Sequence, residues 1–235
     1  MHVKHILIIL FLISFSCSVR SQTVLLNVDH ADEKKFTTEE VGQNLKRFNQ
    51  GFIRLAGIIP PEKPGARVVY GTSMDLAAGF RKKYKFSGAY SLGWEAEIGY
   101  KSYNIKQDAY KQVLGTDLSK KERFNISTIG IGFYNRINFD PQRGNFIGTY
   151  LDLVIKGEYA IFERVLFNKL SDGSNGKLIL SHLPYTRPFQ SELMARFGRG
   201  HFALTASYRI SKLFKALSGY PELPAMTAGF EFGLY

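Results

Sequence analysis

The chain has 235 residues, of which 45% are hydrophobic and 14% aromatic, and it carries a formal net charge of +11 at pH 7. This length suits a single domain with a sizeable core. One cysteine excludes a disulfide-stapled scaffold. Beyond the N-terminus, no segment approaches the roughly 18 consecutive apolar residues of a transmembrane helix, which excludes helical membrane spans.

Residues 1–21 have the pattern of a secretory signal peptide. Lys4 provides a basic start, Ile6 to Phe15 form an apolar run too short to span a bilayer, and Val19 to Ser21 fit a cleavage site. Cys17 leaves a lipoprotein signal as the alternative. Because the chain is predicted to be exported, attraction to anionic lipid headgroups explains its positive charge better than nucleic-acid binding. An ordinary solvated basic surface is the other explanation.

Most of the chain after residue 47 alternates apolar with polar or small residues at period two, which is typical of β-strands. Residues 22–47 are polar and charged, and we expect them to form a periplasmic N-terminal segment. Residues 48–235 are expected to form one β-domain with candidate strands at 48–59, 67–81, 94–101, 124–139, 147–159, 189–197, 201–210 and 225–235. The first of these strands has the weakest pattern.

The alternation places apolar side chains on one face of the strands and charges on the other. Trp94 and Ile98, for example, share a face opposite Glu95. Charges between apolar neighbours do not suit a soluble core strand, but they suit a wall between lipid and a polar lumen. By the same alternation, Val68 and Ile147 are expected on the lipid-facing side.

Short and long connections alternate along the chain. Short turns are predicted at 87–88, 140–145 and 198–200, and long loops at 105–121, 163–183 and 211–224. The second long loop is expected to be a projecting hairpin with its tip at residues 172–176. Together with the aromatic C-terminus, this predicts an all-β fold, an eight-stranded antiparallel up-and-down transmembrane β-barrel with short periplasmic turns and long extracellular loops.

Charged residues of the predicted strands gather on the luminal face. They comprise seven acids and six bases: Asp75, Arg81, Glu95, Glu97, Lys101, Arg136, Asp152, Lys156, Glu158, Glu192, Arg196, Arg209 and Glu231. Because an eight-stranded barrel is just wide enough for side chains to fill it, these charges must pair with one another. We therefore predict a structural ionic network that closes the lumen. The alternative is a narrow proton or ion path.

Several short runs resemble the porT-type outer-membrane β-barrel proteins of Bacteroidota over about residues 65–235. The runs are Tyr90–Trp94, Ser102–Ile105, Tyr134–Phe139, Arg143–Asn145, Ser207–Ser211, Leu213–Lys215 and Tyr220–Pro224. The resemblance implies an eight-stranded barrel in the outer membrane of a Gram-negative bacterium, and it implies little chemistry. The name-giving member is tied to a secretion and gliding apparatus, but no residue of this sequence indicates that it has the same role.

The expected function is therefore that of a non-enzymatic outer-membrane protein without catalytic, cofactor or metal sites. Its expected partners are outer-membrane lipid or lipopolysaccharide and proteins of an envelope or secretion complex, not nucleic acid. One alternative is a surface hydrolase or acyltransferase built from the loop residues Ser171, Asp172, Ser181 and His182. Another is a soluble lipocalin-like barrel, whose apolar faces would point inward around a ligand.

Overall fold

The computed structural model describes residues 41–59, 68–69, 71–106, 121–142, 144–168, 177–216 and 220–235. The predicted signal peptide, most of the predicted N-terminal segment and the hairpin tip at 172–176 lie outside these residues. These described residues form nine strands: β1 Arg47–Ile59, β2 Met74–Lys85, β3 Tyr90–Lys106, β4 Lys121–Asn138, β5 Thr149–Asn168, β6 Lys177–Ser181, β7 Phe189–Arg199, β8 Phe202–Arg209 and β9 Met226–Leu234. Within this described part of the chain, no helix is long and apolar enough to cross a membrane.

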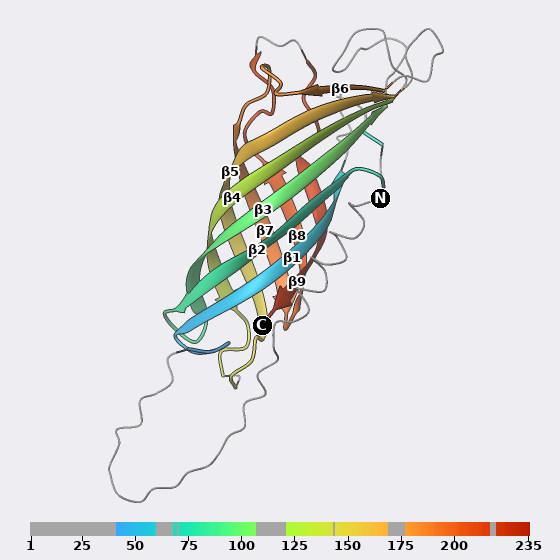
Figure 1. Cartoon of the computed structure of the whole chain (residues 1–235). Coiled ribbons are helices and arrows are strands. Elements are labelled where there is room, and N and C mark those ends of the chain that lie inside the picture. Colours follow the sequence, from blue (N-terminus) through green and yellow to red (C-terminus); the bar gives the residue numbers. More distant parts are fainter. Residues whose placement is uncertain are drawn as a thin grey trace, which may run out of the picture. The chain divides into compact units, whose positions relative to one another are not determined.

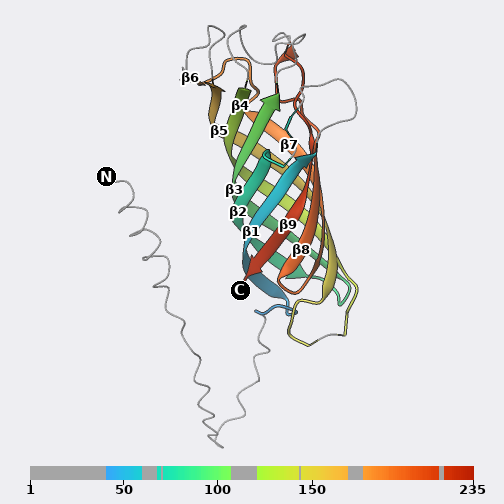
Figure 2. The same cartoon turned by 90° about the vertical axis from the view of Figure 1, so that its right-hand side faces the viewer.

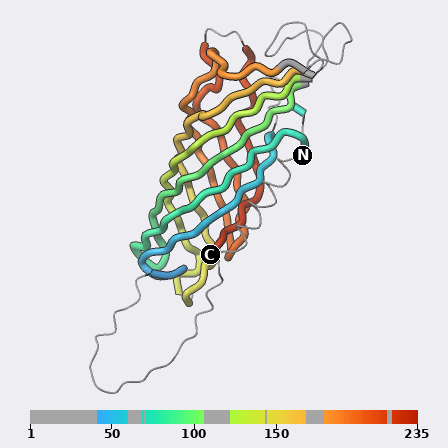
Figure 3. Tube along the Cα trace, in the orientation of Figure 1, coloured from blue at the N-terminus to red at the C-terminus, as the bar shows by residue number. Residues whose placement is uncertain are grey.

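Eight of the strands close into a barrel (Figures 1 and 3). Their order is β4-β3-β2-β1-β9-β8-β7-β5, every pairing is antiparallel, and β5 also pairs with β4. The short β6 pairs only with the end of β5, from Arg164 to Asn168. The prediction of an eight-stranded antiparallel up-and-down barrel is confirmed, including its first strand. The predicted 163–183 loop differs, because β5 continues to Asn168 before β6 returns.

The two ends of the barrel differ in their connections (Figure 2). At one end, which we call the turn end, lie the short β2–β3, β4–β5 and β7–β8 connections and the C-terminal Tyr235. Gly200 takes a φ of 59° in the tight β7–β8 turn, a conformation that glycine adopts without strain. The opposite end, which we call the loop end, carries the remaining connections.

Side chains alternate between the outer surface and the lumen as expected, except near two strand ends. Val68 and Ile147 were expected to face outward, but they are 7% and 5% exposed. That expectation was wrong because neither residue belongs to the neighbouring strand. Val68 precedes a turn at Gly71, where φ is 82°, and Ile147 precedes the first residue of β5. The alternation therefore does not extend to them.

A β-bulge changes the alternation within the long β4–β5 pair. The register shifts between Ser127 and Thr128, which pair with Phe162 and Ala160. Ile161 is thus left without a partner on β4 and is exposed. Before the bulge the even-numbered residues of β5 face the lumen, and beyond it the odd-numbered Val165 and Phe167 do so. The bulge allows β5 to present charges to one half of the lumen and apolar side chains to the other.

The apolar side chains face outward, and the charges face inward. Ile53, Ile98, Ile131 and Leu153 are each at least half exposed, whereas Glu95 and Arg196 are fully buried. A lipocalin-like barrel would need the reverse arrangement, so that alternative is wrong.

The first prediction concerns the seam where β9 pairs with β1 and closes the barrel. A Cβ atom at Gly229 would lie against the backbone of Leu55 and Ala56, 2.7 Å from the Ala56 Cβ. We therefore expect Gly229→Val to prevent closure, which would abolish the heat-modifiable gel mobility of the folded protein in detergent. Ala228→Val, which places the same valine side chain on the exposed side of the same strand, should fold like the wild type. Equal folding of both variants would contradict this register.

Candidate functional site: the filled lumen

The turn end of the lumen is closed by two groups of residues. The first is residues 41–46, which we call the hook, and the second is a small apolar cluster that lies further inside the lumen. The Asn44 amide and side chain donate hydrogen bonds to Asn145 Oδ1 and to the Gly144 carbonyl, both at 3.0 Å. These partners belong to the β4–β5 connection, on the far side of the barrel from β1. Lys83 of β2 also donates to a carbonyl of the hook. The cluster itself comprises Phe48, Ile147 and Tyr150.

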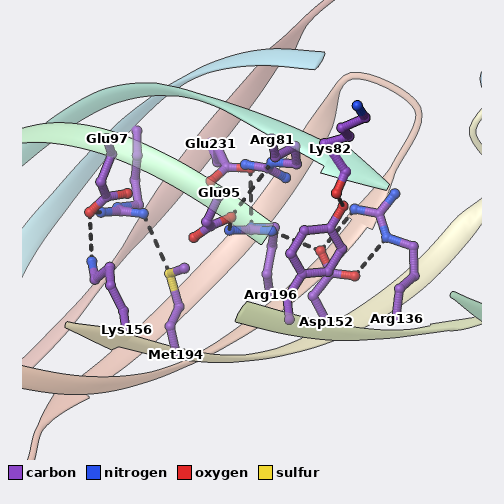
Figure 4. A network of polar contacts seen from close by, with 12 residues as sticks. Arg81, Lys82, Glu95, Glu97, Arg136, Asp152, Lys156, Met194, Arg196 and Glu231 are labelled. Carbon is purple, nitrogen blue, oxygen red and sulfur yellow. Dashed lines mark hydrogen bonds and ion pairs between the residues drawn. The ribbon is translucent and has the colours of Figure 1, made fainter. Parts of the chain in front are cut away.

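Next to this cluster lies a network of buried ion pairs, shown in Figure 4. Asp152 accepts two hydrogen bonds from Arg136, at 2.7 and 2.8 Å, and a third from Arg196 at 2.8 Å. Arg196 also pairs with Glu95 at 2.7 Å and with Glu231 at 3.1 Å. Arg81 completes the network by contacting both of these glutamates, at 3.7 and 2.5 Å. The participating strands are β2, β3, β4, β5, β7 and β9, so the network ties the wall together across the lumen.

A second group of ion pairs lies closer to the loop end. Lys156 contacts Glu97, Glu158 and Glu192 at 2.7, 2.8 and 3.0 Å. Lys101 contacts Glu158 and Glu192 at 2.7 and 2.8 Å. Arg54 of β1 binds Glu97 at 2.8 Å. All of these side chains are at most 4% exposed, so each charge is neutralised by a neighbouring side chain and not by water.

Two tyrosine rings are accommodated by glycines on the neighbouring strand. A Cβ atom at Gly198 would lie 2.5 Å from the Tyr150 ring, and one at Gly93 would overlap Tyr134. Because these glycines have no side chain, the rings lie flat against the inner wall. Arg136 stacks 3.7 Å from the centroid of Tyr150 and 5.5 Å from that of Tyr134. The two glycines therefore position the aromatic surfaces between which Arg136 is held.

The loop end of the lumen is filled by an apolar core that the sequence did not indicate. Strand residues such as Phe124 and Val165 pack there with Leu213, Phe214 and Leu223 of the β8–β9 connection. This connection thus folds back over the barrel as a lid of apolar side chains. Because the core excludes water, it separates the ion pairs from the loop surface.

The predicted luminal residues do not all join the two networks. Arg209 is buried, but it donates to Glu222 at 2.8 Å and to the Leu223 carbonyl at 2.9 Å, both in the β8–β9 connection. Arg209 therefore anchors the apolar lid. Asp75 is 1% exposed, and neither of its carboxylate oxygens has a hydrogen-bond partner. The other predicted residues lie within the two groups of ion pairs described above.

Sequence reasoning missed two luminal groups of the first strand, Arg54 and Gln50. Arg54 and Gln50 lie on β1, whose weak pattern left its two faces unassigned. Alternation from Phe48 would have placed both of them inside with Phe52. Glu222 lies in a loop, and no periodic signal in the sequence relates it to Arg209.

The residues of the hydrolase alternative are not shown to converge. Ser171 and Asp172 lie outside the described residues, and Ser181 is the last residue of β6, paired with Arg164. The exposed His182 ring packs edge-on against Phe162 with centroids 6.2 Å apart. Burial raises the pKa of the nearby Tyr185 phenol further above neutral pH. In the described part of the chain, no group of His, Cys, Asp and Glu is suited to hold a metal ion.

Comparisons with known proteins give only weak likenesses. No family model and no curated protein matches the chain. Among solved structures, it is similar to Ail, the attachment invasion locus protein of Yersinia pestis, with 9% identity, a TM-score of 0.35, and coverage of 80% of this chain and 99% of Ail. Ail in complex with the heparin analogue sucrose octasulfate gives the same identity and TM-score, with coverage of 79% and 97%. These values carry no argument, and the fold rests on the strand pairing.

The second prediction concerns Asp152, which neutralises two buried arginines. Asp152→Asn should lower the free energy of unfolding by about 3–5 kcal/mol, because Arg136 and Arg196 would each lose a buried counter-charge. The measurement is urea unfolding of the protein in lipid vesicles. The control is Asp140→Asn in the exposed β4–β5 turn, which should cost about 1 kcal/mol or less. Equal effects of the two substitutions would contradict the described network.

Proposed function

We propose that this protein is an integral outer-membrane β-barrel without enzymatic activity, whose lumen is closed and which acts through its loop-end surface. The observation that carries the proposal is the outer face of the eight strands. Among the described outward-facing residues of these strands, the charged ones lie near the two ends of the barrel. They are Arg47, Lys82 and Arg199 near the turn end and Arg123 and Arg164 near the loop end. No described outward-facing residue between these two sets is charged. Such a continuous uncharged surface around a closed barrel suits contact with lipid.

Aromatic side chains border this uncharged surface on both sides, as they do in membrane barrels. Exposed rings near the turn end are Phe86, Tyr90, Phe139, Phe146, Phe197, Phe202, Phe232 and Tyr235. Exposed rings near the loop end are Tyr100, Tyr159, Phe162, Phe189 and Tyr208. From Tyr90 to Tyr100, β3 would rise about 25 Å at about 3.3 Å per residue and a tilt of about 40°. This height matches the apolar band of about 25 Å in such proteins.

Basic residues at both ends support lipid headgroups as partners. Near the turn end are Lys46, Arg47, Lys82, Lys85 and Arg199, and near the loop end are Arg123, Arg164, Arg187, Lys212 and Lys215. The described acids at these ends are engaged with protein groups. Asp140 accepts a hydrogen bond from the Thr149 amide, for example, and Glu222 pairs with Arg209. The positive charge at the ends therefore suits anionic phospholipid and lipopolysaccharide phosphates.

The filled lumen supports action at the surface rather than transport. Arg81, Arg136 and Arg196 are among the largest fully buried side chains, and they lie across the lumen between the hook and the apolar lid. A path for ions would have to break several ion pairs at once. The loop end therefore remains as the part that meets other molecules outside the cell, in adhesion or in an envelope or secretion complex. The sequence resemblance described above supports membership of the porT-type family.

The test of the proposed location is fractionation of the native cell envelope. The protein should sediment with outer membranes, resist extraction by carbonate and show heat-modifiable gel mobility. Recovery in the soluble periplasmic fraction would contradict the proposal.

The third prediction concerns conductance. Reconstituted in planar bilayers, the wild-type protein should give no discrete current steps, because its lumen is filled by side chains and closed at both ends. A porin inserted into the same bilayers provides the positive control. Current steps that change in size with Glu95→Gln would contradict the closed lumen and indicate an ion path through the network.

A further inference from the structure

Asp75 differs from every other carboxylate of the luminal networks. It is 1% exposed, and neither of its oxygens has a hydrogen-bond partner. The other six, Glu95, Glu97, Asp152, Glu158, Glu192 and Glu231, each have at least one cation within ion-pair distance. Among these seven acids, Asp75 is thus the one with no cation within ion-pair distance.

The cations near Asp75 are engaged by other acids. In the β2–β3 register, Asp75 lies opposite Lys101, whose Nζ is held by Glu158 and Glu192. On the other side, Asp75 lies opposite Ala56 of β1, which offers no polar side chain. The charged groups that act on Asp75 are Lys101 of β3, Arg54 of β1, Lys156 of β5 and the like-charged Glu192 of β7. Arg54 binds Glu97, and Lys156 binds three glutamates.

A count of the charges in the two networks also singles out Asp75. Their acids number seven with Asp75, whereas their cations are Arg54, Arg81, Lys101, Arg136, Lys156 and Arg196. Arg209 does not alter this balance, because Glu222 neutralises it. Lys83 is not counted with these cations, because it lies at the turn end of β2, where its ammonium group contacts a carbonyl of the hook. If every acid were ionised, one negative charge would remain without a partner in a dry interior.

We propose that Asp75 is a proton-binding site, and that it is a neutral carboxylic acid at neutral pH. An isolated buried carboxylate is far more costly than its neutral form, and a bound proton removes this cost. The proton also balances the charge of the networks. When the proton is lost at alkaline pH, the new negative charge faces Glu192 close to the apolar lid. Asp75 therefore makes the loop-end half of the lumen sensitive to pH, whereas the paired acids keep their charge.

The test is infrared spectroscopy of the folded protein in lipid vesicles at neutral pH. A protonated carboxylic acid has a carbonyl stretching band above the amide and carboxylate bands, and this band shifts downward in heavy water. We expect the wild type to show such a band and Asp75→Asn to lose it. Asp140→Asn, which changes an exposed acid at the turn end, should keep the band.

A stability measurement provides an independent readout of the same proton. Because asparagine resembles a neutral aspartic acid, the two proteins should have similar unfolding midpoints below about pH 4, where Asp75 is protonated in both the folded and the unfolded state. Above this pH the unfolded chain releases the proton that the folded protein retains, so the wild type should lose stability relative to Asp75→Asn as the pH rises to neutral and beyond. The proposal is overturned if the wild type lacks the band or if Asp75→Asn retains it. It is also overturned if Asp75→Asn is as destabilising at neutral pH as Asp152→Asn.

Discussion

The pairing of buried charges inside a narrow wall is the constraint on which the rest of this structure depends. An eight-stranded barrel has room for side chains but little for water, so a luminal charge must find its counter-charge on another strand. Arg196 illustrates the result, since it contacts Glu95, Asp152 and Glu231 from three different strands. Such pairs link strands that are distant in sequence, and Gly93 and Gly198 leave room for the two tyrosine rings beside Arg136.

The lumen is built in layers, and their order limits what the protein can do. From the turn end to the loop end, the hook and its apolar cluster are followed by the ion pairs and then by the apolar core. The apolar layers keep water from the charges, which strengthens the ion pairs and makes an unpaired acid such as Asp75 exceptional. Because both ends are closed, contact with other molecules falls to the outer face and to the loop end.

Much of the barrel could be predicted from the sequence, because alternation at period two decides which side chains face outward and which face the lumen. The luminal positions of Glu95 and Arg136 followed from apolar neighbours such as Trp94 and Ile137. Alternation holds only within a strand, so it misplaced Val68 and Ile147 and gave no indication of the Ile161 bulge. It also could not reveal the pairing of Arg209 with Glu222, because loop conformation depends on tertiary contacts. The apolar lid was missed for the same reason, since Leu213 and Phe214 lie in a connection without periodicity.

The central claim is that one face of each strand meets lipid and the other meets a dry lumen. Ala206 and Ser207 are adjacent residues of β8, one exposed on the outer face and the other buried inside. The most direct test labels Ala206→Cys and Ser207→Cys, in a background without Cys17, with lipid-soluble and water-soluble thiol reagents in native membranes. The account predicts that Ala206→Cys reacts with the lipid-soluble reagent only and that Ser207→Cys reacts with neither. Reaction of Ser207→Cys with the water-soluble reagent would mean a hydrated lumen and would contradict the account.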